Sequence, residues 1–478
     1  MVQPLPIARS RPIWTLVLTA VAFFMVVLDA LVVVTALPAI QRDLHASISM
    51  LEWTVNAFTL AFAAGIITAA ALGDRLGRRR MFTIGLGLFT LASAACALAP
   101  TADLLIAARV TQGLGAAMVM PLSLTILVSA FPPERRGAIV GIWGGIAGLG
   151  VASGPLVGGA VTQGLDWHWI FWVNVPIGAI AILLSRLRLA ESHGPATRLD
   201  LPAAALVSGG AVAIVWGLIR AGEVGWGSGQ AVLSLLLGLL LSAGFLAWER
   251  RAIDPMLPLR LFANRGFAGA NVTAFLMAGA ITSAAFLISQ YFQFALGYSP
   301  LAAGLRLLPW TAMPLLVAPL AGALADRIGL RPVLAVGMLL QGLGLGWIAS
   351  IAAGPTATYG GFVAPLVVAG IGISMALPVA PTAVLSAVSA RDMGKASGVN
   401  STLQRFGSAF ALAVAVAVFT ANGHLGTAAS FTAGFRPALG VVAALSLIGA
   451  VTALSVNSPR RRQMAAPPAR VDVAAAAS

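Results

Sequence analysis

The stretch ALGDRLGRRR at residues 71–80 decides the fold, because a close copy of it, ALADRIGLRP, returns at residues 323–332. Each copy is a charged hairpin between two long apolar segments. A turn with this many charges can lie only where the chain leaves a hydrophobic layer and enters it again. The two copies therefore predict a membrane protein built from two related halves, with both hairpins on the same side.

The composition excludes most other classes of protein. Of the 478 residues, 59% are hydrophobic and only 9% are charged, whereas a soluble domain has roughly 25% charged residues. The formal net charge of +14 does not predict a nucleic-acid partner, because the basic residues form no basic face. The single cysteine, Cys96, leaves no intrachain disulfide, zinc site or redox pair to predict. We expect an all-α polytopic protein that lies in a lipid bilayer.

A transmembrane helix needs about 20 apolar residues, and on that scale the sequence contains fourteen candidate spans. The first apolar segment is too long for the core of a cleaved signal peptide, so we expect it to remain as a span. The spans are predicted at residues 13–34, 51–72, 81–99, 104–127, 138–161, 169–187, 201–220, 230–248, 266–290, 301–324, 333–351, 359–385, 398–420 and 435–456.

The basic residues orient these spans. When the N-terminus is placed in the cytoplasm, 23 of the 29 Lys and Arg residues fall in cytoplasmic segments and three fall outside. This distribution satisfies the positive-inside rule, and an even number of spans puts both termini in the cytoplasm. The remaining three basic residues, Arg109, Arg306 and Arg405, lie within predicted spans.

The hairpins occupy equivalent positions in the two halves. Asp74 follows the start of the first span by 61 residues, and Asp326 follows the start of the ninth span by 60 residues. This spacing predicts six spans, an inserted pair, and six more spans in the same orientation, an arrangement that places a binding site near the bilayer midplane between the halves. The expected domains are an N-terminal six-helix bundle (1–190), the inserted helix pair with its cytoplasmic linkers (191–265), a C-terminal six-helix bundle (266–456) and a disordered cytoplasmic tail (457–478).

Several motifs carry a resemblance to a known family. Besides the two hairpins, they are LDALVVVTALP at residues 28–38, LIAARVTQGLGAA at residues 105–117 and GGIAGLGVASGPLVGG at residues 144–159. On these motifs the chain, from about residue 13 to residue 456, resembles the fourteen-span drug:proton antiporters of the major facilitator superfamily. The resemblance implies the major facilitator fold and a multi-pass exporter of drugs or antibiotics in the cell inner (plasma) membrane.

By this resemblance the hairpins are conformational latches and do not bind substrate. In the first hairpin, Asp74 can accept hydrogen bonds from a neighbouring helix N-terminus or an Arg, and Gly77 can make the turn with a positive φ. The residues assigned to the latches are Asp74, Arg75, Gly77 and Arg78 in the first copy, and Asp326, Arg327 and Gly329 in the second.

Charged residues inside spans predict a proton-coupling site. Asp29 is the only carboxylate deep within an apolar span, and an acid in the membrane marks a functional site. Arg109 lies in the predicted fourth span, where a charge costs about 2.5–3.5 kcal/mol and needs a partner or a wet cavity, and Gln112 shares its helix face. Alternatively, Arg109 reaches toward the outer interface. Glu52 is either a further proton-coupling group or a solvated residue at the start of a helix.

A glycine motif in the fifth span indicates the direction of transport. Gly150, Gly154 and Gly158 recur at every fourth position and give a smooth face for close helix contact, while Pro155 permits a kink. With Gly159, the Gly-Pro-x-x-Gly-Gly order resembles a motif of exporters rather than importers. Packing of small residues alone would also explain these glycines.

A substrate cavity between the halves would suit soft and aromatic side chains, which adapt to varied ligands. These side chains could equally pack against lipid. The candidate lining residues are Met25, Phe58, Phe62, Met118 and Met120.

The sequence contains no recognisable catalytic motif. The only lysine, Lys395, is not part of a P-loop, and neither H-E-x-x-H nor G-x-S-x-G occurs. We therefore expect that the protein is not an enzyme and binds no metal or cofactor. The sequence instead predicts a monomeric, proton-coupled exporter of amphipathic compounds that works by alternating access. A proton on Asp29 could displace a cationic substrate by competing for one negative charge. The alternatives are an exporter or importer of one metabolite, and a pore or non-transporting receptor.

Overall fold

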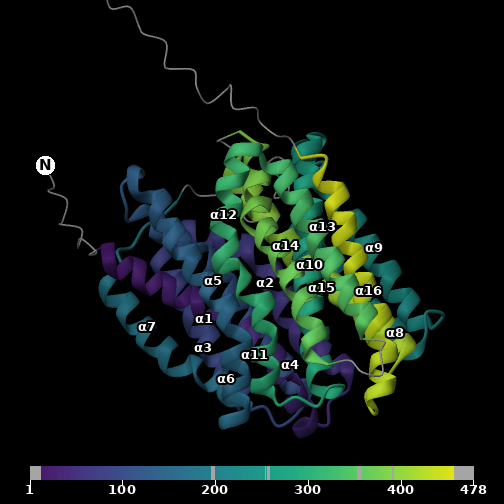
Figure 1. The fold of residues 1–478 in the computed structure, drawn as a ribbon. Coiled ribbons are helices and arrows are strands. Elements are labelled where there is room, and N and C mark those ends of the chain that lie inside the picture. The colour runs from purple at the N-terminus through teal and green to yellow at the C-terminus, as the bar shows by residue number, and fades with distance from the viewer. Residues whose placement is uncertain are drawn as a thin grey trace, which may run out of the picture.

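The computed structural model confirms the predicted all-α fold (Figure 1). All regular elements are helical within the residues that the structure describes, and the predicted tail at 457–478 lies outside them. The described residues are 12–194, 200–252, 255, 259–352, 358–389 and 392–456.

The helices follow one another through short turns. The first half of the chain contains α1 (Pro12–Leu44), α2 (Ile48–Leu76), α3 (Arg78–Ala97), α4 (Ala102–Ser129), α5 (Pro133–Gly164), α6 (Trp169–Trp172) and α7 (Asn174–Arg188). The middle of the chain contains α8 (Leu201–Val224), α9 (Gly229–Glu249) and the 3₁₀ helix η1 (Leu259–Ala263). The second half contains α10 (Arg265–Phe294), α11 (Pro300–Thr311), α12 (Met313–Ile328), α13 (Leu330–Ile351), α14 (Tyr359–Ser386), α15 (Met393–Asn422) and α16 (Ala428–Ala453).

The described residues contain 12 helical segments that are long and apolar enough to cross a membrane, among them α6 with α7 and α11 with α12. Helix α2 bends by 47° and raises the number to 13 when it is counted as one span. The predicted span at 138–161 lies within α5, a helix of 32 residues whose side chains are described only in part. The count of fourteen and the cytoplasmic position of the termini stay predictions.

The two halves of the chain form two groups of helices that lie against each other. In Figure 1, α1, α3 and α7 of the first half lie to the left of α13, α15 and α16 of the second half, and α2 and α4 lie in the middle of the view. The pair α8 and α9 lies at the right edge of the view, where α8 packs against α2 and α15. We name the side on which α1 begins the inner side, following the predicted orientation, and the opposite side the outer side.

The halves are joined toward the outer side. The largest apolar cluster includes the part of α1 from Val32 to Ile40 together with the outer part of α10. Ser289 Oγ donates a hydrogen bond to the backbone oxygen of Val34 (3.5 Å), and Gln293 Nε2 donates to that of Thr35 (3.0 Å). These contacts close the two halves against each other on the outer side.

Candidate functional site

A cluster of polar side chains lies buried within the first half, around Asp29 near the middle of α1. The side chains of Asp29 and Arg109 are each 1% exposed, and Arg109 Nη1 donates to Asp29 Oδ2 at 2.5 Å. Gln112 Nε2 and Asn174 Nδ2 each donate to the other carboxylate oxygen, Oδ1, at 2.9 Å. Donors from α4 and α7 therefore engage both oxygens of the carboxylate.

Arg109 is held on several sides rather than reaching the outer interface. Its Nη1 also donates to Gln112 Oε1 (2.5 Å), and its Nε donates to the backbone oxygen of Thr54 on α2 (3.1 Å). The guanidinium carbon lies 4.3 Å from the ring centroid of Phe58. A buried charge is tolerated only with such a partner and further hydrogen bonds. The structure thus brings together three of the four residues predicted for proton coupling.

Two members of this cluster were not found from the sequence. Asn174 begins α7, and its Nδ2 lies 3.4 Å from Ser93 Oγ on α3. Ser93 Oγ also accepts a hydrogen bond from Gln112 Nε2 (2.8 Å). A polar amide inside the apolar segment WIFWVNVPIG was a signal for Asn174, whereas a serine in a span is too common to single out.

Glu52 contacts Asn56 of its own helix, and its expected position in solvent is wrong. The residue is 0% exposed, and its Oε1 accepts a hydrogen bond from Asn56 Nδ2 (3.1 Å). Helix α2 begins at Ile48 with Ser47 as its N-cap, about one turn earlier than the predicted span. Glu52 therefore lies one turn deeper in the bundle than the sequence suggested.

The first hairpin is organised by two carboxylates. Gly77 has a φ of 107° between α2 and α3, and Asp74 Oδ1 accepts from Arg78 Nε at 2.8 Å. The N-terminus of α3 is capped by Glu191, whose two oxygens accept from successive backbone N–H groups at 2.8 and 3.2 Å. Glu191, which follows α7 and was not singled out from the sequence, thus takes the helix-capping position that was considered for Asp74.

The other predicted latch residues are less engaged. Arg75, Asp326 and Arg327 are exposed, and Gly329 has a φ of 96° at the second turn. Within the described part of the chain, neither hairpin makes a hydrogen bond or an ion pair with the opposite half.

The glycines of α5 lie against two neighbouring helices. A Cβ at Gly154 would lie 2.6 Å from Leu31 Cβ, and a Cβ at Gly158 would collide with Thr35 Oγ1. Gly159 faces the backbone of Pro300 at the start of α11. One face of α5, with Gly150, Gly154 and Gly158, therefore packs on α1 at Val27, Leu31 and Thr35, while Gly159 approaches the opposite half.

Pro155 belongs to the second of these contacts. A Cβ at Gly304 on α11 would collide with the backbone oxygen of Pro155. Close by, Gln163 Oε1 accepts a hydrogen bond from the backbone nitrogen of Leu301 at 3.3 Å. The outer half of α5 and the start of α11 thus touch with almost no side chain between them.

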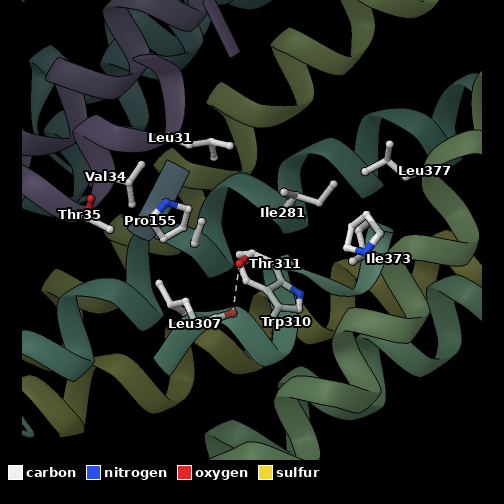
Figure 2. A pocket seen from close by; sticks show the side chains of 12 residues that line it. Leu31, Val34, Thr35, Pro155, Ile281, Leu307, Trp310, Thr311, Ile373 and Leu377 are labelled. Atoms are coloured by element: carbon white, nitrogen blue, oxygen red, sulfur yellow. Dashed lines mark hydrogen bonds between the residues drawn. The ribbon is translucent and has the colours of Figure 1, made fainter. Parts of the chain in front are cut away.

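A cavity lies between the two halves (Figure 2). Its volume of about 40 Å³ is far below the roughly 300–1,000 Å³ of ligand pockets, so this closed arrangement has no room there for a drug-sized molecule. Trp310 Nε1 is buried and has no hydrogen-bond partner among the described residues. The cavity is lined by Leu31, Val34, Thr35 and Pro155 of the first half and by Ile281, Ala285, Leu307, Trp310, Thr311, Pro314, Ile373 and Leu377 of the second.

The five residues predicted for a substrate cavity do not line this one. Met25, Phe58 and Phe62 are buried in the apolar core of the first half, and Met118 and Met120 pack against it. Two of the five do face the second half, because Phe62 and Met120 contact Arg405 of α15.

Comparison with known proteins gives a consistent set of relatives. The profile of the Major Facilitator Superfamily matches residues 19–292 and 270–475. The chain is 34% identical to the tetracenomycin C resistance and export protein of Streptomyces glaucescens, over 85% of this chain and 76% of that protein. It is 35% identical to the methylenomycin A resistance protein of Streptomyces coelicolor, over 90% of this chain and 91% of that protein.

Two further comparisons extend this set. The chain is 37% identical to the multidrug resistance protein Stp of Mycobacterium tuberculosis, over 85% of this chain and 76% of that protein. Among solved structures, a POT family transporter in complex with a thioalcohol-conjugated peptide superposes with a TM-score of 0.70, covering 93% of this chain and 96% of that chain. At 17% identity, this likeness concerns the fold alone.

Proposed function

This chain belongs to the major facilitator superfamily, and from that premise we propose that it exports amphipathic drugs or antibiotics in exchange for protons. Its apolar helices and its relatives make it a multi-pass transporter of the plasma membrane rather than an enzyme. The names of its relatives, which include resistance and export proteins, support the export of antibiotics. The buried pair of Asp29 and Arg109 is the observation that carries the coupling to protons.

In this proposal Asp29 is the group that takes up the proton. As a carboxylate it accepts hydrogen bonds from Arg109, Gln112 and Asn174. A proton on the carboxylate removes its charge and turns one acceptor into a donor, so the attraction to Arg109 is lost. Losing one partner of a buried ion pair costs about 3–5 kcal/mol, which is enough to favour a rearrangement of the helices that meet at this site.

The position of Asp29 on α1 connects this rearrangement to the outer closure. Val34 and Thr35, whose backbone oxygens are hydrogen-bonded by α10, follow Asp29 by about one and a half turns, or roughly 8–9 Å. Further, α5 packs on α1 through its glycines and touches α11 through Gly159. A shift of α1 would therefore disturb both contacts that hold the halves together on the outer side.

The experiment uses everted membrane vesicles in which respiration acidifies the interior. An exporter of this kind consumes the pH gradient when a substrate drug is added, and Asp29→Asn abolishes that consumption. The drugs are chosen beforehand by a growth screen. An efflux-deficient bacterium that expresses this chain is grown in the presence of cationic, neutral and anionic antibiotics. If no compound consumes the gradient and Asp29→Asn changes nothing, the proposal is wrong.

The same vesicles separate the alternatives. A transporter of one metabolite would saturate with a single solute and ignore the drug panel. A pore would dissipate the gradient without any added drug, and a receptor would move no solute at all.

A further inference from the structure

A second intramembrane arginine, Arg405, lies where the two halves meet. It follows the start of α15 by 12 residues, or about 18 Å along a helix of about 45 Å. Its guanidinium carbon lies 4.3 Å from the ring centroid of Phe62 on α2, and its Nη2 lies 3.8 Å from Met120 Sδ on α4. The side chain therefore reaches from the second half across to the first.

The surroundings of Arg405 differ from those of Arg109 in one decisive respect. Arg109 is paired with a carboxylate, whereas the polar contact of Arg405 within the described residues is a thioether sulfur, which is only a weak acceptor. A guanidinium carries five N–H donors, and a charge inside a membrane needs a partner or a wet cavity. The residue Arg405 is partly exposed to solvent.

A second polar group near Arg405 also lacks a partner. Thr402 is 7% exposed, and its Oγ1 has no hydrogen-bond partner in the described part of the chain. It precedes Arg405 by three residues, so both side chains project from the same face of α15. Within the described residues, α15 thus places a hydroxyl without a hydrogen-bond partner one turn from a guanidinium that contacts Phe62 and Met120.

We propose that Arg405 and Thr402 bind the carboxylate of an amphipathic substrate, whose apolar body lies on Phe62 and Met120. A planar guanidinium binds a carboxylate through two parallel hydrogen bonds, and an aromatic ring with a thioether suits an apolar body of variable shape. This inference rests on the proposed export function and names the substrate class as organic anions.

The alternative, a cationic substrate, finds no free negative charge at the buried pair. Both oxygens of Asp29 are occupied by Arg109, Gln112 and Asn174, and the side chain is 1% exposed. A cation would have to displace Arg109 before it could bind there. The partly exposed charge that faces the opposite half is the positive charge of Arg405.

The test measures binding of dansyl-phenylalanine and of its methyl ester to the purified full-length protein in lipid nanodiscs. The two fluorescent probes differ only in the carboxylate. We expect the wild-type protein to bind the acid about 10- to 100-fold more tightly than the ester, as charge-assisted hydrogen bonds imply. Arg405→Gln should abolish this preference. Arg405→Lys keeps the charge and should retain part of the preference, which distinguishes loss of the site from a folding defect.

Arg306→Gln is the matched control. Arg306 is also an intramembrane arginine of the second half, but its guanidinium carbon lies 3.9 Å from the ring centroid of Tyr298, within its own half. This variant should keep the full preference for the acid. Equal binding of both probes to the wild type, no binding of either, or the same loss in Arg306→Gln and Arg405→Gln would overturn the inference.

The outcome is separable from that of the proposed function. Carboxylate binding that depends on Arg405, without any drug-dependent consumption of the pH gradient, would refute export and leave the anion site standing. Proton-driven export without a preference for the acid would refute the anion site alone.

Discussion

Replacing Asp29 by Asn should separate the structural role of the buried pair from the role in proton coupling that we propose for it. The amide has the shape of the carboxylate, and its oxygen can still accept the hydrogen bonds from Gln112 and Asn174, which both lie 2.9 Å from Oδ1. The loss is therefore confined to the contact with Arg109, which now faces an amide donor. Leaving one buried charge without its partner costs about 3–5 kcal/mol of folding free energy.

A double variant, D29N/R109Q, gives a sharper test. It removes both charges, so the desolvation penalty disappears together with the attraction, and such paired replacements can be nearly neutral for stability. We expect D29N/R109Q to recover most of the stability that D29N loses. Neither variant should consume the pH gradient when drug is added, because neither retains a titratable group at this position.

The stability of the purified proteins is followed by thermal unfolding with tryptophan fluorescence, and coupling is followed in everted vesicles. D103N is the matched control, because Asp103 lies in the first turn of the same helix as Arg109 but is exposed to solvent. It should change stability by less than about 1 kcal/mol and leave coupling intact. The reasoning is refuted if D29N is as stable as the wild type, or if the double variant still consumes the pH gradient when drug is added.

Four further changes have defined outcomes. E191Q weakens the cap of α3 and should lower the free energy of unfolding by about 1 kcal/mol, measured by thermal unfolding; unchanged stability would contradict the capping role. D74N should slow turnover in vesicles more than it weakens substrate binding, and a large loss of affinity with normal cycling would contradict a latch. G304V places a side chain against the backbone of α5 and should open the outer contact between α5 and α11. A cysteine introduced at Gln163 should then react faster with an impermeant maleimide than the same cysteine without G304V, over a low background because Cys96 is buried. Equal labelling rates would show that this contact does not hold the outer side closed. Exchange of one monovalent anion for one proton would move two charges down an inside-negative potential, worth about 4.6 kcal/mol per 100 mV. A valinomycin-imposed potential should therefore accelerate export, and indifference to the potential would argue against an anionic substrate.

The parts of this protein that the sequence predicts are those with a strong local signal. The two hairpins and the long apolar segments place most of the helices, and Asp29 and Arg109 attract notice because charges are rare inside spans. Their contact is tertiary: the residues lie 80 positions apart, on α1 and α4. The sequence shows that each charge needs a partner, but it does not show that these two residues are in contact.

The residues that the sequence missed have weak signals. Ser93 is a small polar residue of a kind that spans often contain, and Glu191 follows α7 in a linker without a periodic pattern. Glu52 was placed one turn too shallow because the loop before α2 is only three residues long. The cavity of Figure 2 is lined almost wholly by apolar residues, which look the same in a sequence whether they face a cavity or lipid.

Direct competition between a proton and a cationic substrate for Asp29 is difficult to reconcile with this arrangement. The carboxylate is enclosed by donors of its own half, whereas Phe62 and Met120 contact Arg405 of the opposite half. The ring centroids of Phe58 and Phe62 lie 5.9 Å apart, and each ring carries an arginine at 4.3 Å, Arg109 on Phe58 and Arg405 on Phe62. In an exporter built this way, the proton and the substrate act on opposite ends of one aromatic pair, so movement of α2 and α4 would have to carry the coupling.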